Sequence, residues 1–287
     1  MMDLPQQPVW ITGAKGLIGN CLVHAASECV PSRRAIGLTR EQIDLTDFSA
    51  VRRAFHEQRP QLIIHCAALS KSPDCQANPA LARKLNVEVT ALLAELAAEI
   101  PFIFFSTDLV FDGLLGNYDE SASVNPLSIY AETKVEAEKI VLANPKHTVI
   151  RTSLNGGTSP AGDRGFNEEM RRAWQQGRTL KLFMDEFRSP LPTVVTARAV
   201  WELAALNQPG LYHLAGSEKL SRWQIGRLLA ARWPQFNPQI QAGSLKEYQG
   251  APRSPDTSLN CAKVQKLLSF PLPSLGQWLA DHPREIF

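Results

Sequence analysis

The stretch Ile11–Gly19 reads ITGAKGLIG and places Gly13, Gly16 and Gly19 at GxxGxxG spacing. It follows an apolar run that predicts a buried strand, and it opens a segment with helical periodicity. In that context the first glycine permits a tight turn, the second lets the backbone approach a pyrophosphate, and the third lets the helix pack on the strand. The N-terminus of the helix would offer unpaired N–H groups to phosphate. The stretch predicts a dinucleotide-binding turn, and a plain strand–helix turn without a ligand is the alternative.

Strand and helix patterns alternate from this turn to residue 153. The predicted strands are 8–13, 34–40, 60–68, 101–108 and 147–153, and the predicted helices are 17–29, 44–58, 79–99 and 128–143. Alternation of this kind is typical of βαβ units and a parallel sheet covered on both faces.

The pattern changes after residue 153. We expect an α/β, doubly wound (Rossmann) sheet with a smaller, partly interleaved C-terminal substrate domain. The predicted division is an NAD(P)-binding domain of residues 1–155 with 190–215, and a substrate-binding domain of residues 156–189 with 216–287.

Composition excludes several classes of protein. The chain has 287 residues, of which 44% are hydrophobic and 20% charged, with a formal net charge of +2. That charge predicts no nucleic-acid partner, and we expect no signal peptide and no membrane span. The five cysteines form no CxxC pair and the six histidines share no metal-ligand spacing, so we expect no metal and a reducing cytoplasm. A monomer or homodimer is expected.

The end of the second predicted strand bears on the choice of dinucleotide. An acidic residue there would accept hydrogen bonds from the adenosine ribose, but the sequence places Thr39 and Arg40 at that point. An arginine favours a 2′-phosphate by charge and by its fork geometry. This predicts NADP, with NAD possible if Arg40 is only a surface charge and Glu41 serves the ribose.

The segment Ser128–Lys139, SIYAETKVEAEK, carries Tyr130 and Lys134 four residues apart, and hence on one face of a helix. An ammonium beside a phenol would lower the phenol pKa, so that the pair could exchange a proton near neutral pH. Taken alone, YxxxK is better explained by an ordinary exposed helix. The preceding strand, however, ends in Ser106, Thr107 and Asp108, at the sheet edge where open α/β sheets bind ligands.

Taken together, the motifs resemble the extended short-chain dehydrogenase/reductases, and most closely the dTDP-4-dehydrorhamnose reductase group of sugar-nucleotide reductases. The matching pieces, in chain order, are ITGAKGLIG, DLTD, HCAALS, LNVEVTALLA, STDLVFDG, YAETKVEAE, RTS and RSPDTSLN.

The resemblance implies a role for each matching residue. Tyr130 would protonate the sugar C4 oxygen, Lys134 would lower the pKa of Tyr130 and hold the nicotinamide ribose, and Thr107 would bind the reacting oxygen. The implied cofactor contacts are Gly13, Gly16, Leu17 and Ile18 at the pyrophosphate, Asp44 and Leu45 at the adenine, Ala67 and Ala68 at the adenosine ribose and phosphate, and Ser106 at the nicotinamide. The implied substrate contacts are Thr107, Asp108, Leu154 and Arg253. Asn86 matches an asparagine of the group, and a helix-packing amide is its alternative reading.

Three positions depart from the group's pattern. Leu109 and Leu154 stand where aromatic residues are usual, and Asn260 stands where an aspartate is usual. These changes bear on the identity of the sugar. The expected activity is NADP-dependent reduction of a nucleotide-linked 4-keto sugar. The alternatives are a nucleotide-sugar epimerase with bound NAD and a non-catalytic, NADP-binding regulatory subunit.

Overall fold

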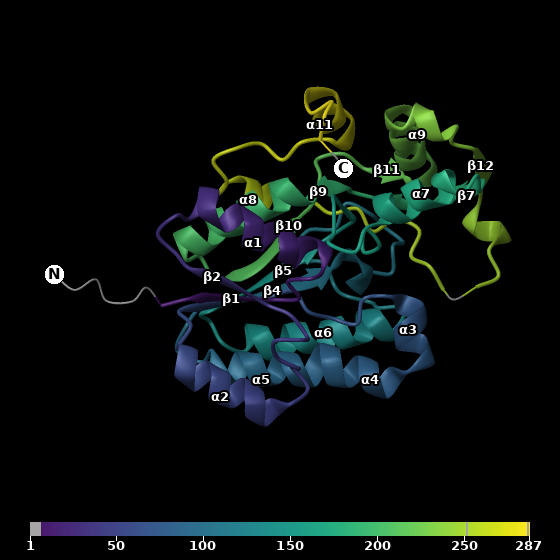
Figure 1. The fold of residues 1–287 in the computed structure, drawn as a ribbon. Coiled ribbons are helices and arrows are strands. Elements are labelled where there is room, and N and C mark those ends of the chain that lie inside the picture. The colour runs from purple at the N-terminus through teal and green to yellow at the C-terminus, as the bar shows by residue number, and fades with distance from the viewer. Residues whose placement is uncertain (1–6, 251, 286) are drawn as a thin grey trace.

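The computed structural model describes residues 7–250, 252–285 and 287. Its centre is a parallel sheet in the order β10-β5-β4-β3-β1-β2 (Figure 1). The strands are β1 (Val9–Thr12), β2 (Ala35–Leu38), β3 (Leu62–His65), β4 (Phe102–Thr107), β5 (His147–Thr152) and β10 (Gly210–Leu214). This sheet confirms the predicted parallel α/β fold.

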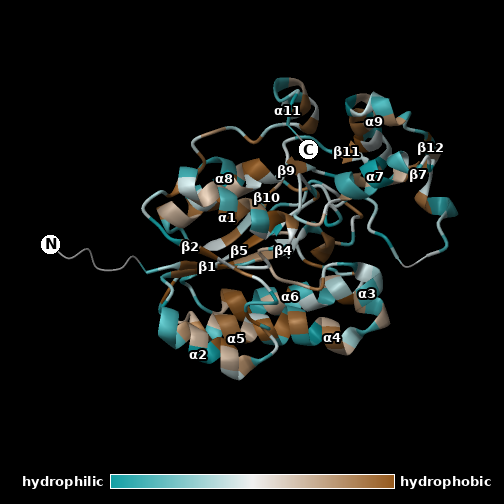
Figure 2. Ribbon diagram, in the orientation of Figure 1, coloured by the Kyte–Doolittle hydropathy of each residue, from teal (hydrophilic) through white to brown (hydrophobic). Residues whose placement is uncertain are grey.

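Helices cover both faces of the sheet because side chains alternate along each strand. Val9 and Ile11 join the core beneath α1 (Leu17–Cys29) and α8 (Thr193–Leu206). Trp10, between them, joins the opposite core, which is formed with α2 (Phe48–Gln58), α5 (Val89–Leu96) and α6 (Ile129–Leu142). Figure 2 shows β1 as one of the hydrophobic segments between the two helical layers.

The long helix expected over 79–99 is interrupted. The structure has α3 (Ser72–Ala77) and α4 (Pro79–Arg83), then a π-helical turn η1 (Lys84–Glu88), which leads into α5. A π-turn inserts one residue into the helical ladder and is often found at functional sites. Here it carries Asn86, whose side chain is buried against α6 and the segment that follows β3.

Most of the remaining elements pack around a third core, whereas the short helix that holds Val264 joins the core beneath α1 and α8. The remaining elements are β6 (Asn155–Gly156), α7 (Phe166–Gln175), β7 (Leu180–Phe183), β8 (Phe187–Arg188), β9 (Leu191–Pro192), β11 (Leu220–Ser221), α9 (Arg222–Arg232), β12 (Ile240–Gly243), α10 (Ala262–Gln265) and α11 (Leu275–Asp281), with short 3-10 turns η2 (Asp108–Val110), η3 (Pro234–Phe236) and η4 (Leu245–Glu247). Trp174, Leu229 and Trp278 are at the centre of the third core. The strand pairs β7–β12 and β8–β11 had no clear signal in the sequence because each strand is short and pairs with a distant one.

The chain returns to the main sheet after entering this third region. β10 pairs in parallel with β5, and α8 packs against α1. These contacts support the proposal that residues 190–215 belong with the nucleotide-binding domain. Residues 1–6 of that predicted domain lie outside the described residues.

Candidate functional site

The glycine turn between β1 and α1 brings main-chain segments into close approach. Gly13 has φ +68°, and a Cβ atom there would lie 2.8 Å from the nitrogen of Ala67. A Cβ atom on Gly19 would lie 2.4 Å from the oxygen of Gly13. The α1 N-cap is Gly16, which has no side-chain cap, so the first N–H groups of α1 lack a side-chain acceptor. The turn therefore has the close packing and the free donors that a pyrophosphate needs.

The ends of β1 and β3 are tied together beside this turn. The Thr12 hydroxyl accepts hydrogen bonds from the nitrogens of Cys66 and Ala67, both at 3.2 Å, and contacts His65 Nδ1 at 2.7 Å. Burial and the charge of Lys134 lower the pKa of His65 to about 3, so the imidazole is neutral. His65 thus acts as a buried hydrogen-bonding residue that fixes the chain carrying Ala67 and Ala68.

Two basic residues, Arg40 after β2 and Lys15 in the glycine turn, lie at this edge of the sheet. Lys15, within the turn, forms an ion pair with Glu41 at 2.6 Å, and the sequence argument did not single out this lysine. Glu41 is therefore already paired, whereas Arg40 is exposed and interacts electrostatically with Asp44. The Asp44 carboxylate accepts hydrogen bonds from the nitrogen and hydroxyl of Thr46.

Two other residues predicted to contact the cofactor, Thr39 and Leu45, make contacts within the protein. The Thr39 nitrogen donates to Gln42 Oε1, and Leu45 packs at the edge of the core beneath α2 and α5.

The carboxyl end of β4 holds the predicted reacting groups. Ser106 Oγ is buried and, among the described residues, has no hydrogen-bond partner. A buried hydroxyl without a partner is uncommon and suits a site where a ligand supplies one. The adjacent Thr107 hydroxyl contacts Asp108 Oδ1 at 3.2 Å and interacts with Tyr130.

Tyr130 and Lys134 project from the same face of α6, as the spacing predicted. Lys134 is 3% exposed, and its Nζ lies 3.9 Å from the ring centroid of Phe104. Burial lowers the pKa of Lys134 to about 7, although the nearby Glu138 carboxylate opposes this shift.

The phenol differs from the expectation. Burial and the charge of Asp108 raise the pKa of Tyr130 above its ordinary value, although the ring is only partly covered and the Thr107 hydroxyl opposes the shift. The expected lowering of the Tyr130 pKa by Lys134 is not found, because burial of the phenol is the largest effect and Asp108 adds to it. Tyr130 is therefore protonated at neutral pH, which is the state required of a proton donor.

Asn86 secures α6 against the segment after β3. Its Oδ1 accepts from the nitrogen of Leu69 at 2.8 Å, and its Nδ2 donates to the oxygen of Leu69 and to the hydroxyl of Thr133. Thr133 stands between the two reacting residues on α6. These contacts favour the helix-packing reading of Asn86, which thereby positions the face of α6 that carries Tyr130 and Lys134.

Two predicted substrate residues are tied into the protein's own structure. Asp108 is buried, and its Oδ2 accepts from the hydroxyls of Ser153 and Thr257 at 2.7 and 2.8 Å. Leu154 packs at the edge of the third core. Both lie beside the predicted site, but the structure assigns a stabilising contact to each.

Arg253 lies at the opening of a buried ionic cluster. Its Nη2 and Nε bind the Glu186 carboxylate at 2.8 and 3.0 Å, and its guanidinium lies 5.6 Å from the rings of Phe183 and Tyr248. Arg188 binds the same carboxylate at 2.9 Å and lies 3.8 Å from Asp108. The sequence argument found Arg253 but missed this cluster, since its members come from separate segments.

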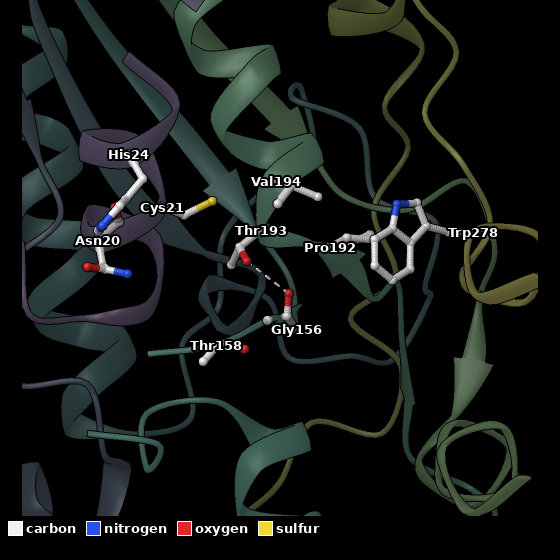
Figure 3. A pocket seen from close by; sticks show the side chains of 10 residues that line it. Asn20, Cys21, His24, Gly156, Thr158, Pro192, Thr193, Val194 and Trp278 are labelled. Carbon is white, nitrogen blue, oxygen red and sulfur yellow. Dashed lines mark hydrogen bonds between the residues drawn. The ribbon is translucent and has the colours of Figure 1, made fainter. Parts of the chain in front are cut away.

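A pocket of about 190 Å³ lies between α1, the N-terminus of α8 and α11 (Figure 3). Cys21 projects toward it from α1, His24 lines it with its ring turned back to the oxygen of Asn20, and Trp278 closes it from α11. The Thr193 hydroxyl donates to the oxygen of Gly156 at its edge. The residues that line this pocket do not include any residue of the predicted site.

No helix within the described ranges is both long and apolar enough to span a bilayer. In the same residues, no group of three or more histidine, cysteine or acidic side chains could hold a metal ion.

The glycine turn, the parallel sheet and the Tyr–Lys helix define an extended short-chain dehydrogenase/reductase fold. Within that class the chain belongs to the family described as the RmlD substrate binding domain, whose model matches residues 7–284.

Individual relatives have different functions. The chain is 27% identical over 282 residues to methionine adenosyltransferase 2 subunit beta of Rattus norvegicus, covering 93% of this chain and 84% of the relative. It is 27% identical over 279 residues to dTDP-4-dehydrorhamnose reductase of Sinorhizobium fredii, covering 92% of each. A dTDP-4-dehydrorhamnose reductase of Bacillus anthracis, solved in complex with NADP, shares the fold with a TM-score of 0.87 at 23% identity, covering 96% of this chain and 98% of that one.

Proposed function

We propose that the protein is an NADP-dependent oxidoreductase that reduces a nucleotide-linked 4-keto sugar. The observation that carries the proposal is the buried Lys134 on α6, one helical turn from Tyr130 and packed on Phe104 of β4, the strand that ends in Ser106 and Thr107. A buried lysine is unfavourable for stability, so its presence beside a phenol supports a role in proton transfer. The family, which includes reductases of this class, supports the same reading.

The residues at the sheet edge fit a nicotinamide dinucleotide. The uncapped N-terminus of α1 and the backbone of Gly13 suit the pyrophosphate, and the unpartnered Ser106 hydroxyl suits the nicotinamide end. Arg40 and Lys15 would provide positive charge for a 2′-phosphate. NADPH would supply the hydride for the reaction when it is bound.

The chain's own residues would handle the sugar and its proton. Thr107 donates a hydrogen bond to the C4 oxygen and holds the carbonyl against Tyr130. Tyr130 gives its phenolic proton to that oxygen as negative charge develops there. Lys134 stabilises the resulting phenolate, and Arg253 binds the diphosphate of the nucleotide.

A panel of nucleotide sugars with NADPH and NADH, followed at the nicotinamide absorbance, tests the proposal. Tyr130→Phe should lower kcat by about 100-fold or more while NADPH affinity stays nearly unchanged. Tyr212→Phe removes a phenolic hydroxyl from β10 and serves as the control. Turnover retained in Tyr130→Phe would remove the proposed mechanism, and turnover without net NADPH consumption would favour an epimerase.

A regulatory subunit is the second candidate. It is favoured by the similarity to methionine adenosyltransferase 2 subunit beta across 93% of this chain. This role predicts NADPH binding without turnover on any nucleotide sugar, together with a stoichiometric partner enzyme in a pulldown. The intact set of Thr107, Tyr130 and Lys134 supports the enzyme, since a non-catalytic protein has no requirement for all three.

A further inference from the structure

Arg222, the first residue of α9, stands beside the ionic cluster centred on Glu186. Its backbone nitrogen donates to the oxygen of Glu186 at 2.8 Å. Its guanidinium lies 5.4 Å from the ring of Phe166 and, among the described residues, makes no hydrogen bond. Arginine has five N–H donors, so a partly buried guanidinium without an acceptor is available for a ligand.

The carboxylates around Arg222 are already in use. Glu186 is 1% exposed, and both of its oxygens accept from Arg188 or Arg253. Arg188 also donates to the oxygens of Phe187 and Ser254. Glu186 attracts Arg222 electrostatically, but the three side-chain hydrogen bonds that its carboxylate accepts come from Arg188 and Arg253.

The charges in this region do not balance. The guanidinium groups of Arg188, Arg222 and Arg253 face the carboxylates of Glu186 and Asp108, which leaves one positive charge uncompensated. Glu169 is the other acidic group that acts on Arg222, but it is exposed and lies 3.9 Å from Lys71.

The pKa of Arg222 agrees with this excess of positive charge. Burial lowers this pKa to about 10, Glu186 opposes the shift, and Arg188 and Arg253 add to it. The charged form of Arg222 is therefore held in an unfavourable environment, which an anion would relieve.

We propose that Arg222 binds the diphosphate of the nucleotide-linked substrate together with Arg253, so that two guanidinium groups hold the two phosphates. The cluster is continuous with the reacting groups, because Arg188 connects Glu186 to Asp108, which follows Thr107 at the end of β4. A diphosphate bound there would have its sugar directed toward Tyr130. The inference rests on the proposed nucleotide-sugar substrate and adds a binding residue to it.

Equilibrium binding tests Arg222 without any need for turnover. Isothermal titration calorimetry with dTDP, UDP, inorganic pyrophosphate and NADPH would compare the wild type with Arg222→Gln. Losing one charge-assisted contact should weaken binding of dTDP or UDP about 10- to 100-fold. NADPH affinity should be unchanged, because its pyrophosphate is bound at the glycine turn. Arg222→Lys keeps the charge without the fork and should give an intermediate loss.

Arg227→Gln is the matched control, since Arg227 is an exposed arginine on the same helix, packed against Trp223. It should leave every affinity unchanged. The proposal also predicts that Arg222→Gln unfolds at the same temperature as the wild type or higher, because an uncompensated charge is removed. A clear fall in melting temperature would make Arg222 structural and would overturn the proposal.

The remaining outcomes are equally decisive. Equal nucleoside-diphosphate affinity in the wild type and Arg222→Gln would overturn the inference, as would a parallel loss of NADPH binding or no binding of either nucleoside diphosphate to the wild type. Tight dTDP or UDP binding that depends on Arg222, with no turnover of any nucleotide sugar, would instead refute the reductase and leave the diphosphate site standing.

Discussion

Lys134→Met should stabilise the protein by an amount that falls as the pH rises. Lys134 is 3% exposed, and its ammonium contacts the ring of Phe104. Its pKa falls from 10.5 to about 7 on folding because burial disfavours the charge. Methionine has a similar unbranched shape without the charge.

The magnitude follows from that pKa difference. Between these two pKa values the unfolded chain binds more protons than the folded protein, so the wild type becomes more stable as the pH rises. At about 1.4 kcal/mol per pKa unit, the destabilisation by Lys134 is about 5 kcal/mol at pH 6 and about 2 kcal/mol at pH 9. Loss of the cation–π contact subtracts about 0.5 to 2 kcal/mol from the gain at pH 6, where Lys134 is charged, and nothing at pH 9, where the amine is neutral.

Urea unfolding at pH 6 and pH 9 measures the effect. Lys139→Met, an exposed position on the same helix, is the control and should show no such pH dependence. A difference between wild type and Lys134→Met that stays constant over this range would refute the buried-ammonium argument. If the proposed function is right, the Lys134→Met variant has no turnover although it is more stable. The charge that destabilises the fold at this position would then be the charge that the reaction needs.

Three other changes give distinct results. Gly13→Ala should lower both the melting temperature and NADPH affinity, because its φ of +68° and the main chain after β3 exclude a Cβ atom. Gly177→Ala is the control: Gly177 has φ +69° with no atom within 4 Å of a Cβ, so the variant should show only the backbone strain of about 1 to 2 kcal/mol. Arg40→Ala should weaken NADPH binding about 10-fold or more and leave NADH binding unchanged, whereas an equal loss for both cofactors would count against a 2′-phosphate contact. Arg151→Met leaves the buried Glu138 carboxylate without the bonds it receives at 3.0 and 2.7 Å, and should lower the free energy of unfolding by about 3 to 5 kcal/mol in chemical denaturation.

Local periodicity accounts for what could be predicted of the fold. The strands and most of the helices follow from patterns a few residues long, because each element must bury one face or both faces. The helix predicted over 79–99 is present, but its pattern did not indicate the π-helical turn in which Asn86 bonds Leu69 and Thr133. The short strand pairs of the third region also depend on partners far along the chain.

The sequence by itself determined the parallel sheet, the position of the glycine turn and the common helical face of Tyr130 and Lys134, since all of these are local. Only the tertiary structure decided the electrostatics. Burial beside Asp108 raises the phenol pKa that the spacing alone predicted to be lowered. It also places Arg222 beside a glutamate whose side-chain hydrogen bonds come from Arg188 and Arg253. A charge's energy depends on its solvent exposure and on its neighbours in space, and for these residues the folded chain brings both from separate segments.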